Sequence, residues 1–559
     1  MMLNDAPQDR RAHEASDKNA FAPASSKAAA LLLAAILCVT FYGFRSNSLI
    51  GDGLRHLPAL RTILPGTPPA FQPKPWLEIY RDHYDDLVVH NHLLFGATMR
   101  AAFALQQALG IRSDALVAMY AINALSSAIA GALFFLLCLR LGVAKWTSLA
   151  LALGLCLSPA YLLAATNIAE IALPLPFFIG TLLLLTSPQF AGWTPVAAGV
   201  LAALAALTYL LAGALVPCIA LAVIAIRFPS RSAAKPILLF LSSFGVVFAG
   251  LWLTVLVSSG YRSPARLLHA VLYFPQEGTY GGFKFGSLIA APVGLTQAFL
   301  SVLPDDFVGL KSLLHPASWA TLYVGAATLL VCAVLAIVFY VLFRRGAFRT
   351  LLVLSCLLTF LLVEAACVKW DPYYQKLQLF ALILCWTMVA AALSSSPQLS
   401  GVRWPVFLFL TLVLAGGLWT LRKNVQPSQA RANAQQLYAI VGNGELITAW
   451  SGDVMHMFLY SNLEHMVSLP DMAFARHLDS QRVQQDLNTL IQQAAAEHRN
   501  VYIYGLFDEK TGSPSDIYET RFRLTGITEY LRGLQQKSKP VARLPQPAGQ
   551  SIVLYLYVP

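Results

Sequence analysis

The first residue that could do chemistry is Asp52, a carboxylate directly after the first long apolar run of the chain. It lies in the segment GDGLRH (51–56), where Arg55 and His56 follow it as candidate substrate contacts. A general base needs hydrogen-bond reach to a hydroxyl proton and a tuned pKa, and a carboxylate at a membrane interface can meet both an acceptor hydroxyl and a lipid phosphate. The flanking glycines would let a substrate approach the backbone. Alternatively, Asp52 only pairs with Arg55 at a helix end.

A second group of candidates lies further along the same polar segment. Asp85 and Asp86 form a carboxylate pair that, with His83 and His90, could bind a divalent cation or orient an acceptor. The alternative is a solvated loop face. The triplet HNH at 90–92 is not a metal signature by itself, because residues two apart share a face only in an extended chain. We therefore expect no metal cofactor, although a divalent cation remains possible.

Two further carboxylates lie at the ends of apolar runs. Glu170 is in a short turn near the middle of the N-terminal half, and Glu364 stands five residues before Lys369. Ionisable residues at membrane depth are costly and are usually functional or paired. Either carboxylate could face an interior cavity, whereas Glu364 and Lys369 could also form a structural pair.

Basic side chains gather in a second long polar segment. Arg262, Arg266 and Lys284 are natural ligands for a phosphate or pyrophosphate. The stretch YFPQEGTYGGFKFG (273–286) is rich in glycine and aromatic residues, which suits a mobile loop that packs against sugars. Interfacial anchoring by the aromatic rings is the alternative.

The composition shows what must position these residues. The chain has 559 residues, of which 57% are hydrophobic and 12% charged, and its mean hydropathy is +0.60. These values exclude an ordinary cytosolic enzyme and a disordered chain. The net charge of +11 is assigned to cytoplasmic loops rather than to nucleic-acid binding, because no basic tract with interleaved aromatics occurs. The eight cysteines lie in or beside apolar runs without a C-x-x-C pair, so no zinc or redox motif is present.

Eleven apolar runs are expected to cross a membrane, since a span needs ~20 residues. They cover about 28–46, 115–139, 147–165, 171–186, 194–210, 212–227, 236–258, 320–343, 349–367, 376–394 and 404–421. The segment 194–226 could instead be one broken helix, which leaves ten spans. Eleven spans place the short basic segments around the first, second, sixth and eighth spans on one side, the cytoplasm.

This topology divides the chain into three parts. We expect a disordered cytoplasmic N-terminus (1–27), a membrane domain (28–421) with exterior loops at 47–114 and 259–319, and an exterior domain (422–559). The end of the first loop, 91–110, is apolar enough to form a helix on the membrane surface.

The C-terminal part alternates between strand and helix patterns. Strands are expected at Glu445–Trp450, Val501–Phe507 and Ser551–Val558, with a helix at Ser480–His498. This alternation is typical of a small α/β domain. No glycine-rich phosphate loop opens the helix, which argues against a nucleotide site.

The order of these features resembles the GT-C membrane glycosyltransferases, in the branch similar to protein mannosyltransferases and lipid A aminoarabinose transferase. The acidic motif at Asp52 follows the first span, and HNHLLFG (90–96) closes the long loop. AINAL (121–125) lies in the second span, LSPAY (157–161) in the third, and LTYL (207–210) joins the fifth to the sixth. The resemblance covers about residues 28–260 by motif and the whole chain by topology.

The resemblance implies a sugar donor on a polyprenyl phosphate and transfer at the exterior face of a membrane, here a bacterial inner membrane, with a glycan, lipid or protein as acceptor. It implies an acidic residue of the first exterior loop as the catalytic group, and Asp52 is the matching position. It also implies exterior basic residues as ligands of the donor phosphate, without a tightly held metal. The sequence departs from the family pattern in three places. Tyr209 stands where a lysine often follows the threonine, Asp52 has no second acid before Glu78, and Asn167 and Glu170 occupy a turn that often carries an arginine.

Three other functions remain open from the sequence. A polysaccharide polymerase or ligase would use diphosphate-linked chains and Arg or His chemistry. A transporter or flippase for a lipid-linked intermediate predicts inverted repeats and charges near midspan, and neither is evident. A non-catalytic assembly protein would use its exterior tail to bind partners.

Overall fold

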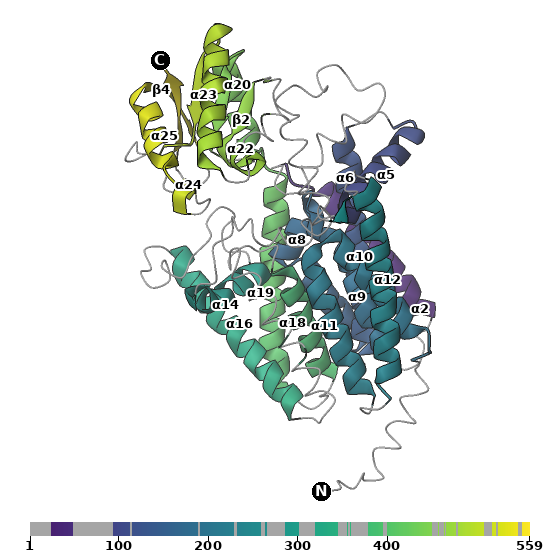
Figure 1. The fold of residues 1–559 in the computed structure, drawn as a ribbon. Coiled ribbons are helices and arrows are strands. Elements are labelled where there is room, and N and C mark those ends of the chain that lie inside the picture. Colours follow the sequence, from purple (N-terminus) through teal and green to yellow (C-terminus); the bar gives the residue numbers. More distant parts are fainter. Residues whose placement is uncertain are drawn as a thin grey trace, which may run out of the picture.

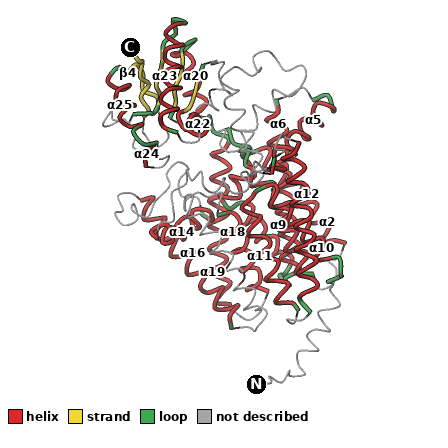
Figure 2. The backbone as a smooth tube through the Cα atoms, in the orientation of Figure 1, coloured by secondary structure: helices red, strands yellow, loops and turns green. Residues whose placement is uncertain are grey.

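The computed structural model describes most of the helical core and of the C-terminal domain. The described residues are 24–47, 93–111, 114–187, 190–228, 232–258, 263–264, 285–300, 319–344, 355, 358, 378–394, 400–449, 457, 463, 465–476, 479–507, 517–520, 524–545 and 551–558. A helical bundle carries a small α/β domain at one end (Figure 1). Within the described residues the strands are confined to that domain (Figure 2).

The bundle is built from helices rich in Ala, Leu, Val and Phe, which bury their side chains against one another. They are α2 (Ala24–Gly43), α6 (Ala115–Arg140), α7 (Lys145–Cys156), α8 (Pro159–Thr166), α9 (Pro174–Leu185), α10 (Thr194–Thr208), α11 (Leu210–Arg227), α12 (Ala234–Ser258), α14 (Phe285–Phe299), α16 (Trp319–Phe343), α18 (Leu379–Ser394) and α19 (Ser400–Asn424). Proline begins α8 and α9, where its missing N–H costs no hydrogen bond. Asp114 caps α6 by accepting a hydrogen bond from the backbone N–H of Leu116 (3.1 Å).

Several of these helices could cross a membrane. Among the described residues, five helices are long and apolar enough, the pair α7 and α8 would together form a sixth span, and four shorter apolar helices accompany them. Each predicted span except 349–367 contains one of the bundle helices, and 349–367 lies outside the described residues apart from positions 355 and 358. The number of spans therefore stays a prediction.

The third predicted span (147–165) contains two helices with a sharp bend between them, and whether they form one span stays a prediction. α7 and α8 meet at an angle of 68°. Ser158 is extended (φ −62°, ψ 136°), because a residue before proline is disfavoured in the helical region. Its hydroxyl donates to the Gly154 carbonyl (2.8 Å) and accepts from Trp386 Nε1 (3.3 Å), which fixes the break inside the bundle.

The segment 194–226 is interrupted, which agrees both with two spans and with the single broken helix of the ten-span alternative. Tyr209 is extended (φ −152°, ψ 111°) and separates α10 from α11.

A close helix crossing holds α10 against α12. A Cβ atom on Gly199 would lie 2.5 Å from the Phe240 carbonyl oxygen, so only glycine fits this position.

Part of the second predicted loop (259–319) is a helix that packs into the bundle. The second half of α14 is buried, and Phe299 lies edge-on to Trp386 (ring centroids 5.8 Å apart) and to Phe409 (5.2 Å). The loop interpretation missed this helix because its flanking residues are polar and rich in glycine.

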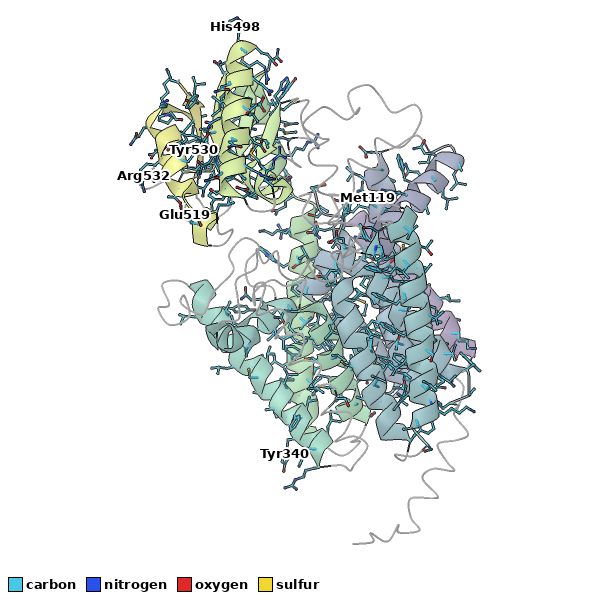
Figure 3. All side chains as sticks on the ribbon, in the orientation of Figure 1. Met119, Tyr340, His498, Glu519, Tyr530 and Arg532 are labelled. Atoms are coloured by element: carbon cyan, nitrogen blue, oxygen red, sulfur yellow. The ribbon has the colours of Figure 1, made fainter. Side chains whose placement is uncertain are left out.

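The predicted surface helix at 91–110 is present as α5 (Leu93–Ala108). Phe95, Met99 and Phe103 recur at every fourth position and are buried, which is the pattern of one helix face. This face covers the beginning of α6, near Met119 (Figure 3), and the segment after α8 around Ile168. α5 therefore packs on the bundle at the end that carries the C-terminal domain, hereafter the domain end.

The C-terminal domain contains a five-stranded sheet in the order β2-β1-β3-β5-β4. Its elements are α20 (Gln429–Val441), β1 (Glu445–Thr448), β2 (Met466–Ser468), α22 (Leu469–Ala475), α23 (Ser480–Ala496), β3 (Val501–Tyr504), α24 (Ile517–Thr520), α25 (Ile527–Gln536), β4 (Ser538–Pro545) and β5 (Ser551–Tyr557). β1 is parallel to β2 and β3, whereas β5 is antiparallel to β3 and β4. The predicted strands and helix thus appear as β1, β3, β5 and α23.

Alternate side chains of the sheet serve two cores. Ile447 and Ile503 pack with α23 and α25, whereas Leu446 and Tyr502 pack with α20 on the opposite face. The amino ends of β1 and β3 point away from the bundle. His498, just before β3, lies at the tip of the C-terminal domain away from the bundle, and Glu519 of α24 lies at the edge of the domain that faces the bundle (Figure 3).

Candidate functional site

A group of polar residues gathers at the domain end, where α2 ends, α6 begins and both α8 and α19 end. This polar cluster consists of Ser46, Asn47, Tyr120, Asn123, Thr166, Asn167, Glu170 and Asn424. Most of these side chains are buried, in a region whose neighbours are apolar. Buried polar groups are stable only when they are hydrogen-bonded, so their arrangement is specific.

The cluster fixes the point at which the chain leaves α2. The backbone N–H of Ser46 donates to the Thr166 carbonyl (2.9 Å), and the Ser46 carbonyl accepts from the Tyr120 hydroxyl (2.9 Å). The next residue, Asn47, donates from its backbone N–H to the Asn424 carbonyl (2.9 Å). Residues 46 and 47 are thereby held to α6, α8 and α19 directly before the segment that contains Asp52.

A second set of bonds joins the cluster to the connection between bundle and C-terminal domain. Asn424 Nδ2 donates to Thr166 Oγ1 (2.9 Å), and the Asn47 side chain donates to the Val425 carbonyl (3.0 Å). Thr166 Oγ1 itself donates to the Leu162 carbonyl in α8 (2.6 Å). The end of α19 is therefore part of the same hydrogen-bonded unit as the end of α2.

Asn123 organises the turn between α8 and α9. Its Nδ2 donates to the carbonyl oxygens of Asn167 (2.8 Å) and Ala169 (3.0 Å). This turn leads into a single 3-10 turn, Glu170–Ala172, and places Glu170 in the interior with 6% of its surface exposed. Glu170 is therefore buried, while its predicted role as a substrate contact stays a prediction.

The LTYL motif lies beside aromatic side chains of α9 and α18. The Tyr209 ring is 6.3 Å from that of Phe380, which in turn lies edge-on to Phe178 at 5.3 Å. Tyr209 thus packs against an aromatic pair.

Of the predicted site residues, Glu170 alone lies within the described part of the chain. The other predicted residues, all outside the described part of the chain, are Asp52, Arg55, His56, Asp85, Asp86, His90, Arg262, Arg266, Lys284 and Lys369. Within the described ranges, no group of three or more His, Cys, Asp and Glu residues could hold a metal ion.

Sequence reasoning missed most of the polar cluster. Tyr120 and Thr166 lie within apolar runs that were interpreted only as spans, and Asn123 was used only as part of the AINAL motif. The available signal was Asn123 itself, since an asparagine within a span needs a hydrogen-bonding partner.

Comparison with known proteins now places the fold. No protein-family model matches the sequence, and neither does any curated protein. Among solved structures, the chain is similar to ArnT from Cupriavidus metallidurans bound to undecaprenyl phosphate, with a TM-score of 0.53 at 12% sequence identity. The match covers 95% of this chain and 98% of that chain. The fold is ArnT-like. Apo ArnT gives a TM-score of 0.45 at 13% identity, with the same coverage.

The ArnT likeness confirms the fold that the sequence resemblance implied. ArnT is a GT-C lipid A aminoarabinose transferase, which belongs to the branch that the order of motifs indicated. Because the match extends over nearly the whole length of both chains, it includes the helical bundle and the C-terminal part.

Proposed function

We propose that this protein transfers a sugar from a polyprenyl-phosphate donor to an acceptor of the cell envelope. The observation that carries the proposal is the ArnT-like fold over 95% of the chain, since that ArnT structure contains undecaprenyl phosphate. The order of sequence motifs supports the same class independently. A glycan, a lipid or a protein could be the acceptor.

The proposed reaction takes place at the exterior face of a bacterial inner membrane. In this orientation the N-terminus is cytoplasmic, and the domain end and the C-terminal domain are exterior. The support comes from the short basic segments, which collect on the opposite side when eleven spans are assumed.

Asp52 is the proposed catalytic base. It follows Asn47 by five residues, and a chain spans at most ~3.6 Å per residue, so its Cα stays within about 18 Å of that of Asn47. Connectivity alone therefore limits Asp52 to this radius around Asn47, whose backbone is bound at the polar cluster.

In the proposed mechanism Asp52 accepts the proton of the acceptor hydroxyl, whose oxygen attacks the anomeric carbon of the donor sugar. The bond between that carbon and the phosphate oxygen breaks, and polyprenyl phosphate leaves with the electron pair. Arg262, Arg266, Lys284 and Lys369 would stabilise the charge that develops on the phosphate.

The remaining candidates are proposed substrate contacts. Arg55 and His56 follow the catalytic residue, while Asp85, Asp86 and His90 belong to the same long segment between α2 and α5. Glu170 is the one of these candidates that the structure places in the polar cluster.

Mass spectrometry of envelope glycans, lipids and glycoproteins in a deletion strain tests the proposed function. Loss of one specific sugar, restored by the wild-type gene, supports transfer. Accumulation of a lipid-linked precursor without the loss of a particular sugar would instead support transport, and it would contradict the proposal.

A further inference from the structure

Two amide oxygens of the polar cluster are buried without a hydrogen-bond donor. Asn123 is fully buried and Asn167 is 2% exposed, and within the described residues nothing donates to Asn123 Oδ1 or to Asn167 Oδ1. A buried acceptor without a partner has lost its hydrogen bonds to water and gained none, so native proteins seldom retain one without a water, an ion or a ligand.

The orientation of Asn123 is determined by its other bonds. Nδ2 must be the nitrogen, because it faces two carbonyl oxygens, those of Asn167 and Ala169. Oδ1 is therefore an acceptor that points elsewhere. Both unpartnered oxygens belong to residues that meet at the turn after α8, which also contains the buried carboxylate of Glu170.

The chemistry of these atoms selects the ligand. Amide oxygens accept hydrogen bonds and cannot donate them, so their complement is a hydroxyl or an amino group. The oxygens of an ionised phosphate diester are themselves acceptors and would be repelled. At Asn123, whose orientation is fixed, the turn after α8 is therefore suited to the sugar part of a lipid-linked donor and not to its phosphate. The Asn167 amide makes no hydrogen bond within the described residues, so it can turn its oxygen to the same sugar.

We propose that Asn123 and Asn167 bind hydrogen-bond-donating groups, hydroxyl or amino, of the donor sugar. This inference rests on the proposed function and assigns one subsite of that reaction. The polyprenyl chain of the donor would lie in the hydrocarbon, which would bring its sugar to the end of the bundle where Asn123 contacts the Asn167 backbone. An ordered water molecule is the competing occupant.

The variant Asn167→Ala separates ligand binding from a structural role. Within the described residues the Asn167 side chain makes no hydrogen bond, so its removal should leave the melting temperature unchanged or raise it. Ser127→Ala is the matched control. It also removes a buried oxygen without a partner, but Ser127 lies one turn of α6 beyond Asn123, about 6 Å further into the bundle.

The experiment measures binding to the full-length protein in lipid nanodiscs. The probes are undecaprenyl phosphate and a panel of undecaprenyl phosphates that carry a hexose, an N-acetylhexosamine or an aminopentose. We expect wild type to bind one panel member more tightly than bare undecaprenyl phosphate. Asn167→Ala should lose about tenfold in affinity for that member, which corresponds to one lost hydrogen bond to a substrate hydroxyl. Its affinity for bare undecaprenyl phosphate should be unchanged. Asn167→Ser, which restores a small hydroxyl, should lie between.

Other outcomes overturn the inference in distinguishable ways. An Asn167→Ala protein that keeps the wild-type preference shows that the site holds water alone, and the proposed function stands. Equal weakening by Ser127→Ala, or a lowered melting temperature with weaker binding of every probe, assigns Asn167 a structural role. A wild-type protein that binds bare undecaprenyl phosphate as tightly as every panel member has no sugar subsite. A wild-type protein that binds no probe contradicts the proposed function as well.

Discussion

The side-chain amide of Asn123 donates to the backbone carbonyl of Asn167 across 44 positions of sequence, at 2.8 Å. A second bond, to Ala169, leaves the turn after α8 dependent on one side chain of α6. Helical hydrogen bonds cannot replace these two bonds, because α8 ends at Thr166 and α9 begins only at Pro174.

Asn123→Ala should therefore destabilise the bundle. It leaves two carbonyl oxygens of a buried turn without their donor, which costs about 2–3 kcal/mol. Thermal unfolding in detergent measures the effect as a lowered melting temperature. Ser127→Ala is the control, because the Ser127 hydroxyl makes no hydrogen bond within the described residues. An Asn123→Ala protein as stable as this control would show that the turn is stable without the Asn123 side chain.

Tyr120→Phe should weaken catalysis more than stability. The Tyr120 hydroxyl binds the Ser46 carbonyl, and its removal costs about 1 kcal/mol while loosening the exit from α2. If that exit positions Asp52, kcat should fall by a factor of ~10–100, with the KM for the donor little changed. Steady-state kinetics tests this split, and a rise in KM with unchanged kcat would assign the hydroxyl to substrate binding.

Gly199→Ala should lower the stability of the bundle. The new Cβ would lie 2.5 Å from the Phe240 carbonyl oxygen, so α10 and α12 would have to separate, at a cost of about 1–3 kcal/mol. Gly245→Ala on α12 is the matched control, because a Cβ there meets nothing within 4 Å and helix propensity favours alanine by up to ~1 kcal/mol. Equal melting temperatures for the two variants would show that the crossing is not tight.

The stability of the C-terminal domain should depend on Glu445. Burial raises the pKa of this carboxyl above its ordinary value of 4.5, although Arg499 at 2.6 Å acts in the opposite direction. A raised pKa means that the folded state binds the proton more tightly than the unfolded chain. The domain therefore loses stability as pH rises from about 4.5 through the raised pKa.

Hydrogen exchange of the β1 and β3 amides in the full-length protein, corrected for the intrinsic effect of pH, measures this dependence. Glu445→Gln should flatten the profile over the same pH range. If protection instead rises with pH in wild type, the pair with Arg499 outweighs burial and the pKa of Glu445 is lowered rather than raised.

The sequence was sufficient for features that depend on local pattern. The apolar character of 91–110 predicts the helix α5, and the strand-like runs of the C-terminal part predict β1, β3 and β5. β2 has only three residues, too few for a period to show, and was not predicted. The break at Pro159 was overlooked because the residues on both sides are equally apolar.

The polar cluster could not be predicted in the same way. Ser46, Asn123, Thr166 and Asn424 come from four helices and are brought together only by tertiary packing. Within its own segment each is an isolated polar residue, and most such residues in apolar helices have purely local partners. Glu170 was predicted because a buried carboxylate is unusual enough to be noticed alone.

The central claim is that Asp52 is the base for sugar transfer from a polyprenyl phosphate. The direct measurement is transfer by purified full-length Asp52→Asn in nanodiscs, using the donor that the wild-type protein accepts and the cognate envelope acceptor. We expect a loss of ~10²–10⁴-fold in kcat, with unchanged melting temperature and unchanged binding of undecaprenyl phosphate, while Asp82→Asn in the same segment keeps full activity. An Asp52→Asn protein that transfers sugar at the wild-type rate would contradict the account.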